Sequence, residues 1–315
     1  MNKDVISSAV LGSAVGDALG VPYEYETREY MENHQISGMS AYGTHNQPAG
    51  TWSDDTSMTL ALLDSLSSGR LDLEDIAGRF VSWYRNGEYT PHGIVFDIGI
   101  STEKSVIMLE NGSDPYSSGA SSQFDNGNGS LMYIMPLALF LYNEENSEKR
   151  MRDVFSVSGI THNHIRSKIS CFFYNELIIA AVKYRDIEKS YASACSSINN
   201  SGIFDIYPEE YDNFETLLRG NIKDLQINDI RSSGYVINTL EAALWCVFNS
   251  ESYSDAVLSA VMLGEDTDTT ASVTGALAGI IFGYDSIPRK WISSLANFEL
   301  IKSIIKKFSN MKTVM

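Results

Sequence analysis

Residues 50–56 place two carboxylates between hydroxyl side chains at the predicted start of a helix. Ser53, Asp54 and Asp55 follow a Pro-Ala-Gly turn and precede an apolar stripe at helical spacing. A capping hydroxyl and two acids that complement the helix dipole explain this segment when it is taken alone. A binding site for a cation explains it equally well. The choice depends on whether other acids meet it in space.

Residues 263–270 repeat the pattern, with Asp266, Asp268 and Thr269 before a predicted helix of small residues. Side chains at i and i+2 point apart on a regular helix, so Asp266 and Asp268 can converge only across the junction of loop and helix. If both segments face one site, four carboxylates crowd together, which is strongly unfavourable without a cation. Oxygen ligands without a nearby Cys or His favour a hard ion, Mg²⁺ or Mn²⁺.

Two series of glycines predict the helices that position these segments. Glycine recurs at every fourth position in each series, at Gly12, Gly16 and Gly20 and again at Gly275, Gly279 and Gly283. Because glycine costs roughly 1 kcal/mol in a helix interior relative to alanine, such a repeat indicates backbones in close contact. We expect both helices to be buried and closely crossed. Asp17 interrupts the first series, which argues against a membrane pair.

Composition limits the class of protein. The chain has 315 residues, a formal net charge of −17 and 43% hydrophobic residues. This charge argues against binding to nucleic acid. We expect no membrane span, because no stretch of about 18 apolar residues lacks a charge, and no signal peptide, because a basic leading segment is missing. The widely spaced Cys171, Cys195 and Cys246 fit reduced thiols of a cytoplasmic protein.

Apolar spacing predicts an all-α protein with no sustained strand pattern. The expected helices cover residues 5–20, 58–66, 71–85, 131–142, 167–184, 234–245, 271–283 and 299–308. Residues 21–49 have no sustained period, and we interpret them as a lid over the first acidic segment. Residues 186–232 are polar and expected to be peripheral. No repeat or linker divides the chain, so residues 1–315 are predicted to form a single domain.

Three segments in this order, 12–20, 50–56 and 264–269, resemble the ADP-ribosylglycohydrolase family. That family includes the dinitrogenase reductase-activating glycohydrolases and the ADP-ribosyl-acceptor hydrolases. The resemblance extends from about Val5 to Trp291. It implies a compact orthogonal helical bundle that hydrolyses the bond between ADP-ribose and a protein side chain, with arginine as the expected acceptor. Two Mg²⁺ ions, with Mn²⁺ as an alternative, are implied as cofactors.

The resemblance also assigns roles to residues. The implied metal ligands are Ser53, Asp54, Asp55, Asp266, Asp268 and Thr269. The implied catalytic residues are Asp97, Glu24 and Asp55. Contacts with ADP-ribose are implied for Asn126, Gly127, Asn128, Gly129, Ser130, His162 and Tyr235. Four of these residues also have a structural interpretation. Asp97 could be a helix cap, Glu24 a solvated loop acid, His162 a structural histidine and Tyr235 a core-packing residue.

The sequence departs from the family pattern at two places. Tyr133 stands where relatives usually carry an arginine, which puts any role of that arginine in doubt. Met262 and Glu265 stand where the family often has Asn and Gly, and Glu265 is expected to add an acid beside the metals.

Two other functions fit the same residues. One is release of ADP-ribose from an oxygen linkage, on serine or on a small metabolite. The other is a non-catalytic protein that binds ADP-ribose or blocks a transferase. In the preferred interpretation the partners are an ADP-ribosylated protein and the product ADP-ribose.

Overall fold

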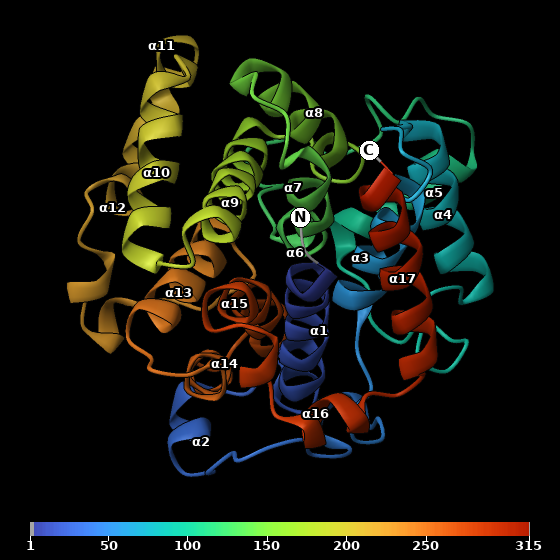
Figure 1. Cartoon of the computed structure of the whole chain (residues 1–315), viewed down its shortest axis with the longest axis vertical. Helices are drawn as coiled ribbons and strands as arrows, with labels where there is room; N and C mark the ends of the chain where they lie inside the picture. Colours follow the sequence, from blue (N-terminus) through green and yellow to red (C-terminus); the bar gives the residue numbers. More distant parts are fainter. Residues whose placement is uncertain (1–2, 315) are drawn as a thin grey trace.

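A computed structural model of the protein describes residues 3–314, and in that range α-helices joined by loops and short 3-10 turns form the whole fold (Figure 1). Isolated bridges take the place of β-strands within these residues. The predicted all-α class is therefore confirmed. Residues 1, 2 and 315 of the predicted domain lie outside the described residues.

The central pair of helices is α1 (Lys3–Gly20) and α15 (Thr267–Phe282), which lie side by side in Figure 1. A methyl group built on Gly12 would lie 2.3 Å from the carbonyl oxygen of Gly275, and one on Gly16 would lie 2.0 Å from that of Ala271. These contacts are too short for any side chain. The glycine spacing thus predicted the helix pair correctly. Gly283 is the exception, because it stands just after the last residue of α15, with φ of 88°, and does not pack against α1.

Helix α1 is buried along almost its whole length, as its apolar composition requires. By length and composition alone, the helical residues 3–23 could cross a membrane. However, 94% of the apolar window lies inside the protein, so this segment is a core helix of the bundle.

The remaining helices surround the central pair. Those in contact with α15 include α3 (Asp54–Leu66), α9 (Ile165–Tyr184), α13 (Val236–Phe248) and α14 (Tyr253–Met262). The outer helices on the side of α3 are α4 (Leu73–Asn86), α5 (Ile100–Glu110) and α17 (Phe298–Val314). The helices around α9 are α6 (Gly129–Tyr133), α7 (Met135–Leu141), α8 (Ser147–Gly159) and α10 (Ile187–Asn200). The shorter α11 (Ile203–Ile206), α12 (Glu215–Leu218) and α16 (Arg289–Ser294) complete the bundle.

Two predicted segments differ from the structure. The helix expected over 131–142 is divided into α6 and α7 at Ile134, because Pro136 lacks a backbone N–H and begins a new helix. Residues 186–232 include α10, which lies at the outer edge of Figure 1 but buries Tyr191 and Ile198 against the core. The polar composition of this region concealed its apolar face.

The segment between α1 and α3 is partly fixed. It contains the short helix α2 (Arg28–Glu32), and the Arg28 guanidinium donates to the carbonyl oxygens of Ile227 and Ile230, each at 2.7 Å. Two backbone hydrogen bonds join residues 25 and 26 to Glu265, at 2.6 and 2.7 Å. These contacts hold the start of the segment against the loop that precedes α15. A lid movement of this segment stays a prediction.

Candidate active site and metal centre

The two acidic segments meet in the structure. Asp54 and Asp55 begin α3. Ser53 is its N-cap, as predicted, and its Oγ accepts a hydrogen bond of 3.3 Å from the Asp55 backbone N–H. Asp268 lies in the first turn of α15, preceded by Asp266. The Thr269 hydroxyl donates to Asp55 Oδ2 at 3.2 Å across the two helix starts. The predicted convergence is therefore confirmed.

Glu24 joins this cluster. One oxygen each of Glu24, Asp266 and Asp268 lies within 4.8 Å of the others. The Glu24 residue is only 6% exposed, so its alternative interpretation as a solvated loop acid is wrong. The physical reason is the backbone pairing with Glu265, which brings the loop over the start of α15.

Asp97 lies near Glu24 and His45. The ligand atoms of Glu24, His45 and Asp97 lie within 4.8 Å of one another, and His45 Nε2 forms a short hydrogen bond with Glu24 Oε2. Gly99 is the residue that precedes α5, so Asp97 is not a helix cap. The expectation of a site without a nearby histidine is wrong beside Glu24 and Asp97, where His45 lies. His45 stands in an irregular loop, and no spacing in the sequence points to it.

The carboxylates are electrostatically strained. Burial raises the pKa of Asp54, Asp55 and Asp268 well above the usual range, and neighbouring carboxylates raise it further. Burial likewise raises the pKa of Glu24 and Asp266. A bound cation would reverse these shifts, because it stabilises the charged form of each group.

The cluster has free coordinating atoms for such a cation. Asp55 Oδ1 and Asp266 Oδ1 are buried, and neither has a hydrogen-bond partner among the described residues. A buried acceptor left without a partner costs about 1–3 kcal/mol, more for a charged group. The other oxygen of Asp266 accepts from Asn128 Nδ2 at 2.8 Å, which orients the carboxylate. The donors therefore fit a hard divalent cation, whose identity they do not select.

Asp17 is a site residue that the sequence analysis missed. It is buried in α1 and accepts from the backbone N–H groups of Ser53 and Thr56, at 2.9 and 3.0 Å, and from the Thr56 hydroxyl at 2.6 Å. These bonds attach the start of α3 to the central helix pair. Burial raises the pKa of Asp17 to about 6, although the hydrogen bonds from Thr56 and Ser53 oppose this shift. An acid inside an otherwise apolar helix was the available signal.

The predicted ADP-ribose loop, residues 126–130, lies beside Asp266. Its backbone pairs with the segment before α13, through Asn128 N–H to the Gly234 carbonyl and Val236 N–H to the Asn126 carbonyl, each at 3.0 Å. Asn126 Oδ1 is buried without a partner among the described residues. Ser130, in contrast, is fully buried and accepts from the Ser158 hydroxyl at 3.0 Å, which turns it toward the core.

His162 and Tyr133 occupy the core beneath this loop. His162 is only 2% exposed, and burial lowers its pKa to about 4, so its ring is neutral at pH 7. A methyl group built on Gly129 would lie 2.7 Å from the His162 ring, which explains the glycine there. The Tyr133 hydroxyl hydrogen-bonds to the Thr161 hydroxyl at 2.7 Å, so the position is a core position in this chain. The His162 ring thus packs against the 126–130 loop at Gly129.

Two other predicted positions have clear surroundings. Tyr235 is half-buried, with the Arg166 guanidinium 6.0 Å from its ring, and its contact with a ligand stays a prediction. Glu265 is exposed and lies outside the carboxylate groups of the described residues that could hold a metal. The expectation that it adds an acid beside the metals stays a prediction. Its φ of 60° explains why a glycine suits this position.

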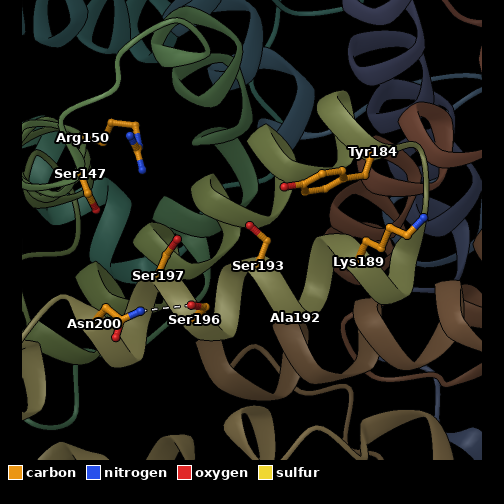
Figure 2. A pocket seen from close by; sticks show the side chains of 9 residues that line it. All are labelled: Ser147, Arg150, Tyr184, Lys189, Ala192, Ser193, Ser196, Ser197 and Asn200. Atoms are coloured by element: carbon orange, nitrogen blue, oxygen red, sulfur yellow. Dashed lines mark hydrogen bonds between the residues drawn. The ribbon is translucent and has the colours of Figure 1, made fainter.

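A separate groove lies away from the acid cluster. It has a volume of about 660 Å³, and Figure 2 shows its polar lining along α10, with Ser193, Ser196 and Lys189 on that helix and Arg150 across from them. No residue of the acid cluster lines it. A smaller pocket has Asp54 and Asp97 in its wall beside Trp52 and Phe96. Chemistry, and not volume, therefore marks the candidate site.

Comparison with known proteins gives a consistent result. A family model described as ADP-ribosylglycohydrolase matches residues 2–314. The chain is 31% identical over 310 residues to ADP-ribosylarginine hydrolase Tri1 of Serratia proteamaculans (strain 568), covering 98% of this chain and 80% of that protein. It is 29% identical over 293 residues to ADP-ribosyl-[dinitrogen reductase] glycohydrolase of Rhodospirillum rubrum, covering 91% and 88%. A solved structure titled ADP-ribosylglycohydrolase-related protein complex superposes with a TM-score of 0.78 at 25% identity, covering 98% of both chains.

Proposed function

The chain belongs to the ADP-ribosylglycohydrolase family, and from that premise we propose that it is a hydrolase that removes ADP-ribose from modified arginine side chains of proteins. The observation that carries the proposal is the meeting of Asp55 with Asp266 and Thr269, and of Glu24 with Asp266 and Asp268. The name of the Serratia relative, an ADP-ribosylarginine hydrolase, supports the arginine acceptor.

We propose that the cluster holds two hard cations, Mg²⁺ or Mn²⁺. The residues that would hold them are Ser53, Asp54, Asp55, Asp266, Asp268 and Thr269. Such ions, when bound, supply positive charge that orients ribose hydroxyls and the attacking water. The unpartnered oxygens of Asp55 and Asp266 support this assignment, because they are buried acceptors that nothing else in the described residues satisfies.

The reaction is hydrolysis at the anomeric carbon of the ribose that carries the acceptor. Water adds to this carbon and gives up one proton. The C–N bond to the acceptor breaks with its electron pair remaining on nitrogen, and the departing guanidine takes up that proton to leave as a guanidinium. The transition state resembles an oxocarbenium ion, so nearby carboxylates stabilise it. Asp97 would pair with the acceptor guanidinium and hold the bond in line. Glu24 and Asp55 would orient the attacking water.

The loop at 126–130 would bind the rest of the substrate. The backbone N–H groups of Gly127 and Gly129 suit a diphosphate, because glycine allows close approach of a ligand to the backbone. Asn126, with its free Oδ1, and Asn128 are the polar side chains of this loop, and Tyr235 lies on the segment paired with it. Because the site draws on both ends of the chain, we propose that residues 1–315 act as one domain. The three free cysteines support a cytoplasmic location.

Asp97→Asn tests the arginine assignment. The variant keeps the shape of the side chain but loses the charge that pairs with a guanidinium. We expect turnover of an arginine-linked substrate to fall about 10²-fold or more, the scale of losing one acid–base or positioning group. Affinity for free ADP-ribose should be unchanged, because that ligand has no acceptor. A paired assay on arginine- and serine-linked substrates, with an ADP-ribose titration, measures both.

Glu88→Gln is the matched control, since Glu88 is an exposed acid in the loop that leads to Asp97. It should retain wild-type turnover. Full arginine-linked activity in Asp97→Asn would contradict the role of Asp97. Turnover of serine-linked substrate alone would favour an oxygen linkage, and binding of ADP-ribose without any turnover would favour a non-catalytic protein.

A further inference from the structure

Tyr25 has an unusual conformation beside the candidate site. Its residue is 69% exposed, and its φ is 67°, a region that an aromatic residue rarely adopts. Its backbone N–H donates to the Glu265 carbonyl at 2.6 Å, and the next N–H, of Glu26, donates to the Tyr23 carbonyl at 3.0 Å. The loop therefore holds a large ring at the surface at a conformational cost, next to the carboxylate of Glu24.

Three rings form a row at the edge of the cluster, which we call the aromatic row: Tyr25, His45 and Phe96. The centroids of Tyr25 and His45 are 6.1 Å apart, and those of His45 and Phe96 are 5.3 Å apart, with tilted planes in both pairs. Glu24 precedes Tyr25 in the chain, and its carboxylate forms a hydrogen bond with His45 Nε2, the middle ring of the row. Asp97 follows Phe96 in the chain, so carboxylates accompany the row at both ends.

An aromatic face with carboxylates beside it suits a planar cation. A guanidinium stacks on such a face and donates to carboxylates in its own plane, and it loses less hydration than an ammonium. A serine acceptor has no charge and no planar group, so it would gain nothing from the ring. The exposed ring therefore offers discrimination between acceptors that the buried metal cluster cannot supply.

We propose that Tyr25 is a specificity-determining residue, whose ring binds the guanidinium of the arginine acceptor while Asp97 pairs with its charge. The inference rests on the proposed function and adds a residue that contacts the acceptor.

Tyr25→Leu and Tyr25→Phe separate the ring from the hydroxyl. Loss of the ring in Tyr25→Leu should raise KM for an arginine-linked substrate roughly 3- to 30-fold, the range of a cation–aromatic contact at a partly desolvated site, with little change in kcat. Tyr25→Phe should stay within about twofold of the wild type, because the ring remains. KM for a serine-linked substrate and affinity for ADP-ribose should not change in either variant.

Tyr42→Leu is the matched control, because Tyr42 is another aromatic residue of the same segment with φ of 70° and 63% exposure. Tyr25→Gly is a second variant without the ring, and glycine suits the positive φ, so folding is preserved. An unchanged KM in both ring-free variants, with normal wild-type turnover, overturns this inference alone. An equal rise in KM for both linkages also overturns it. Absence of arginine-linked turnover in the wild type overturns the proposed function, and this inference with it.

Discussion

Asp17 and Asn128 orient the acid cluster from two sides. Asp17 accepts hydrogen bonds from the first turn of α3, and Asn128 donates to Asp266 at 2.8 Å and to Thr239 at 2.9 Å. Neither is predicted to hold an ion. Groups that orient ligating carboxylates keep them in place before a metal arrives, and their loss typically costs 10- to 100-fold in metal affinity or activity.

Asp55→Asn tests the metal centre at the scale of one residue. The change removes a charge that lies among other buried carboxylates and that carries an unpartnered oxygen. We expect binding of Mg²⁺ or Mn²⁺ to weaken at least about tenfold, and the melting temperature of the metal-free protein to rise because repulsion is relieved. Isothermal calorimetry and thermal unfolding with a chelator measure the two effects.

Glu74→Gln, at an exposed position of α4, is the control and should change neither quantity. Unchanged stoichiometry and affinity in Asp55→Asn would remove Asp55 from the ligand set. Dependence of activity on Zn²⁺ in place of Mg²⁺ or Mn²⁺ would contradict the choice of a hard ion.

At the scale of residues, the sequence predicted those site residues that belong to a repeated pattern. Two segments rich in acids and hydroxyls predicted Asp54, Asp55, Asp266 and Asp268 as site residues, and the structure brings the two segments together. His45 could not be predicted, because a single histidine in a loop without period carries no spacing. Its position depends on how the loop folds back over Glu24, which is a tertiary effect.

At the scale of elements, the contact between α1 and α15 sets the geometry of the site. Gly20 lies where α1 ends, and a methyl group built there would lie 2.3 Å from the Asp268 Cα. The Thr267 hydroxyl donates to the Gly20 carbonyl at 2.8 Å. The close approach of the two backbones thus continues to the first turn of α15, where the acids begin.

Gly16→Ala tests this element contact. Its new methyl group would meet the Ala271 carbonyl oxygen at 2.0 Å, and only a shift of the whole helix could relieve the clash. We expect a loss of roughly 1–3 kcal/mol or more in the free energy of unfolding, typical of overpacking in a dense core, together with weaker metal binding. Urea unfolding and metal titration provide the measurements.

Gly78→Ala is the opposite case on α4, because a methyl group there meets nothing within 4 Å. It should raise the free energy of unfolding by up to about 1 kcal/mol, the difference in helix propensity. If Gly16→Ala were as stable as Gly78→Ala, close packing would not be the reason for the glycine series.

Helix boundaries show where local patterns are sufficient. Spacing placed α1, α4, α9 and α15 within a few residues of their observed ends, because each carries a clear apolar period or cap. It missed the break between α6 and α7, since an apolar run conceals the effect of Pro136. It also missed α10, whose buried residues are separated by many serines.

At the scale of the whole molecule, stability without metal should fall as pH rises. A carboxyl whose pKa is raised by folding binds its proton more tightly in the folded state, so its stabilising effect is present below the unfolded pKa and is lost as pH rises through the folded pKa. This is the case for Asp17, whose contribution is lost between its unfolded pKa of about 4 and its folded pKa of about 6. It is also the case for Asp54, Asp55 and Asp268, whose pKa is raised well above the usual range, so these three carboxyls account for a decline at higher pH. His162 has the opposite sign, because its pKa is lowered to about 4, but its contribution is complete above its unfolded pKa.

We therefore expect the free energy of unfolding in a chelator to decline above about pH 6.5, the unfolded pKa of histidine. Excess Mg²⁺ should remove the decline, because the ionised carboxylates then have a cation as partner. Urea titrations from slightly acid to slightly alkaline pH, with chelator or Mg²⁺, measure this. Stability that increased with pH in the chelator would contradict a cluster of protonated carboxyls.

The order of synthesis gives the contact between α1 and α15 a further consequence. The bond between Thr267 and Gly20 spans 247 residues of chain. At about 5–20 residues per second, a ribosome needs roughly 12–50 s to supply the second helix after the first. During that interval α1, apolar enough to resemble a membrane segment, lacks the partner that buries it. The nascent chain is thus exposed to misdirection and aggregation at α1 until α15 has been made, and the acid cluster can assemble only after that point.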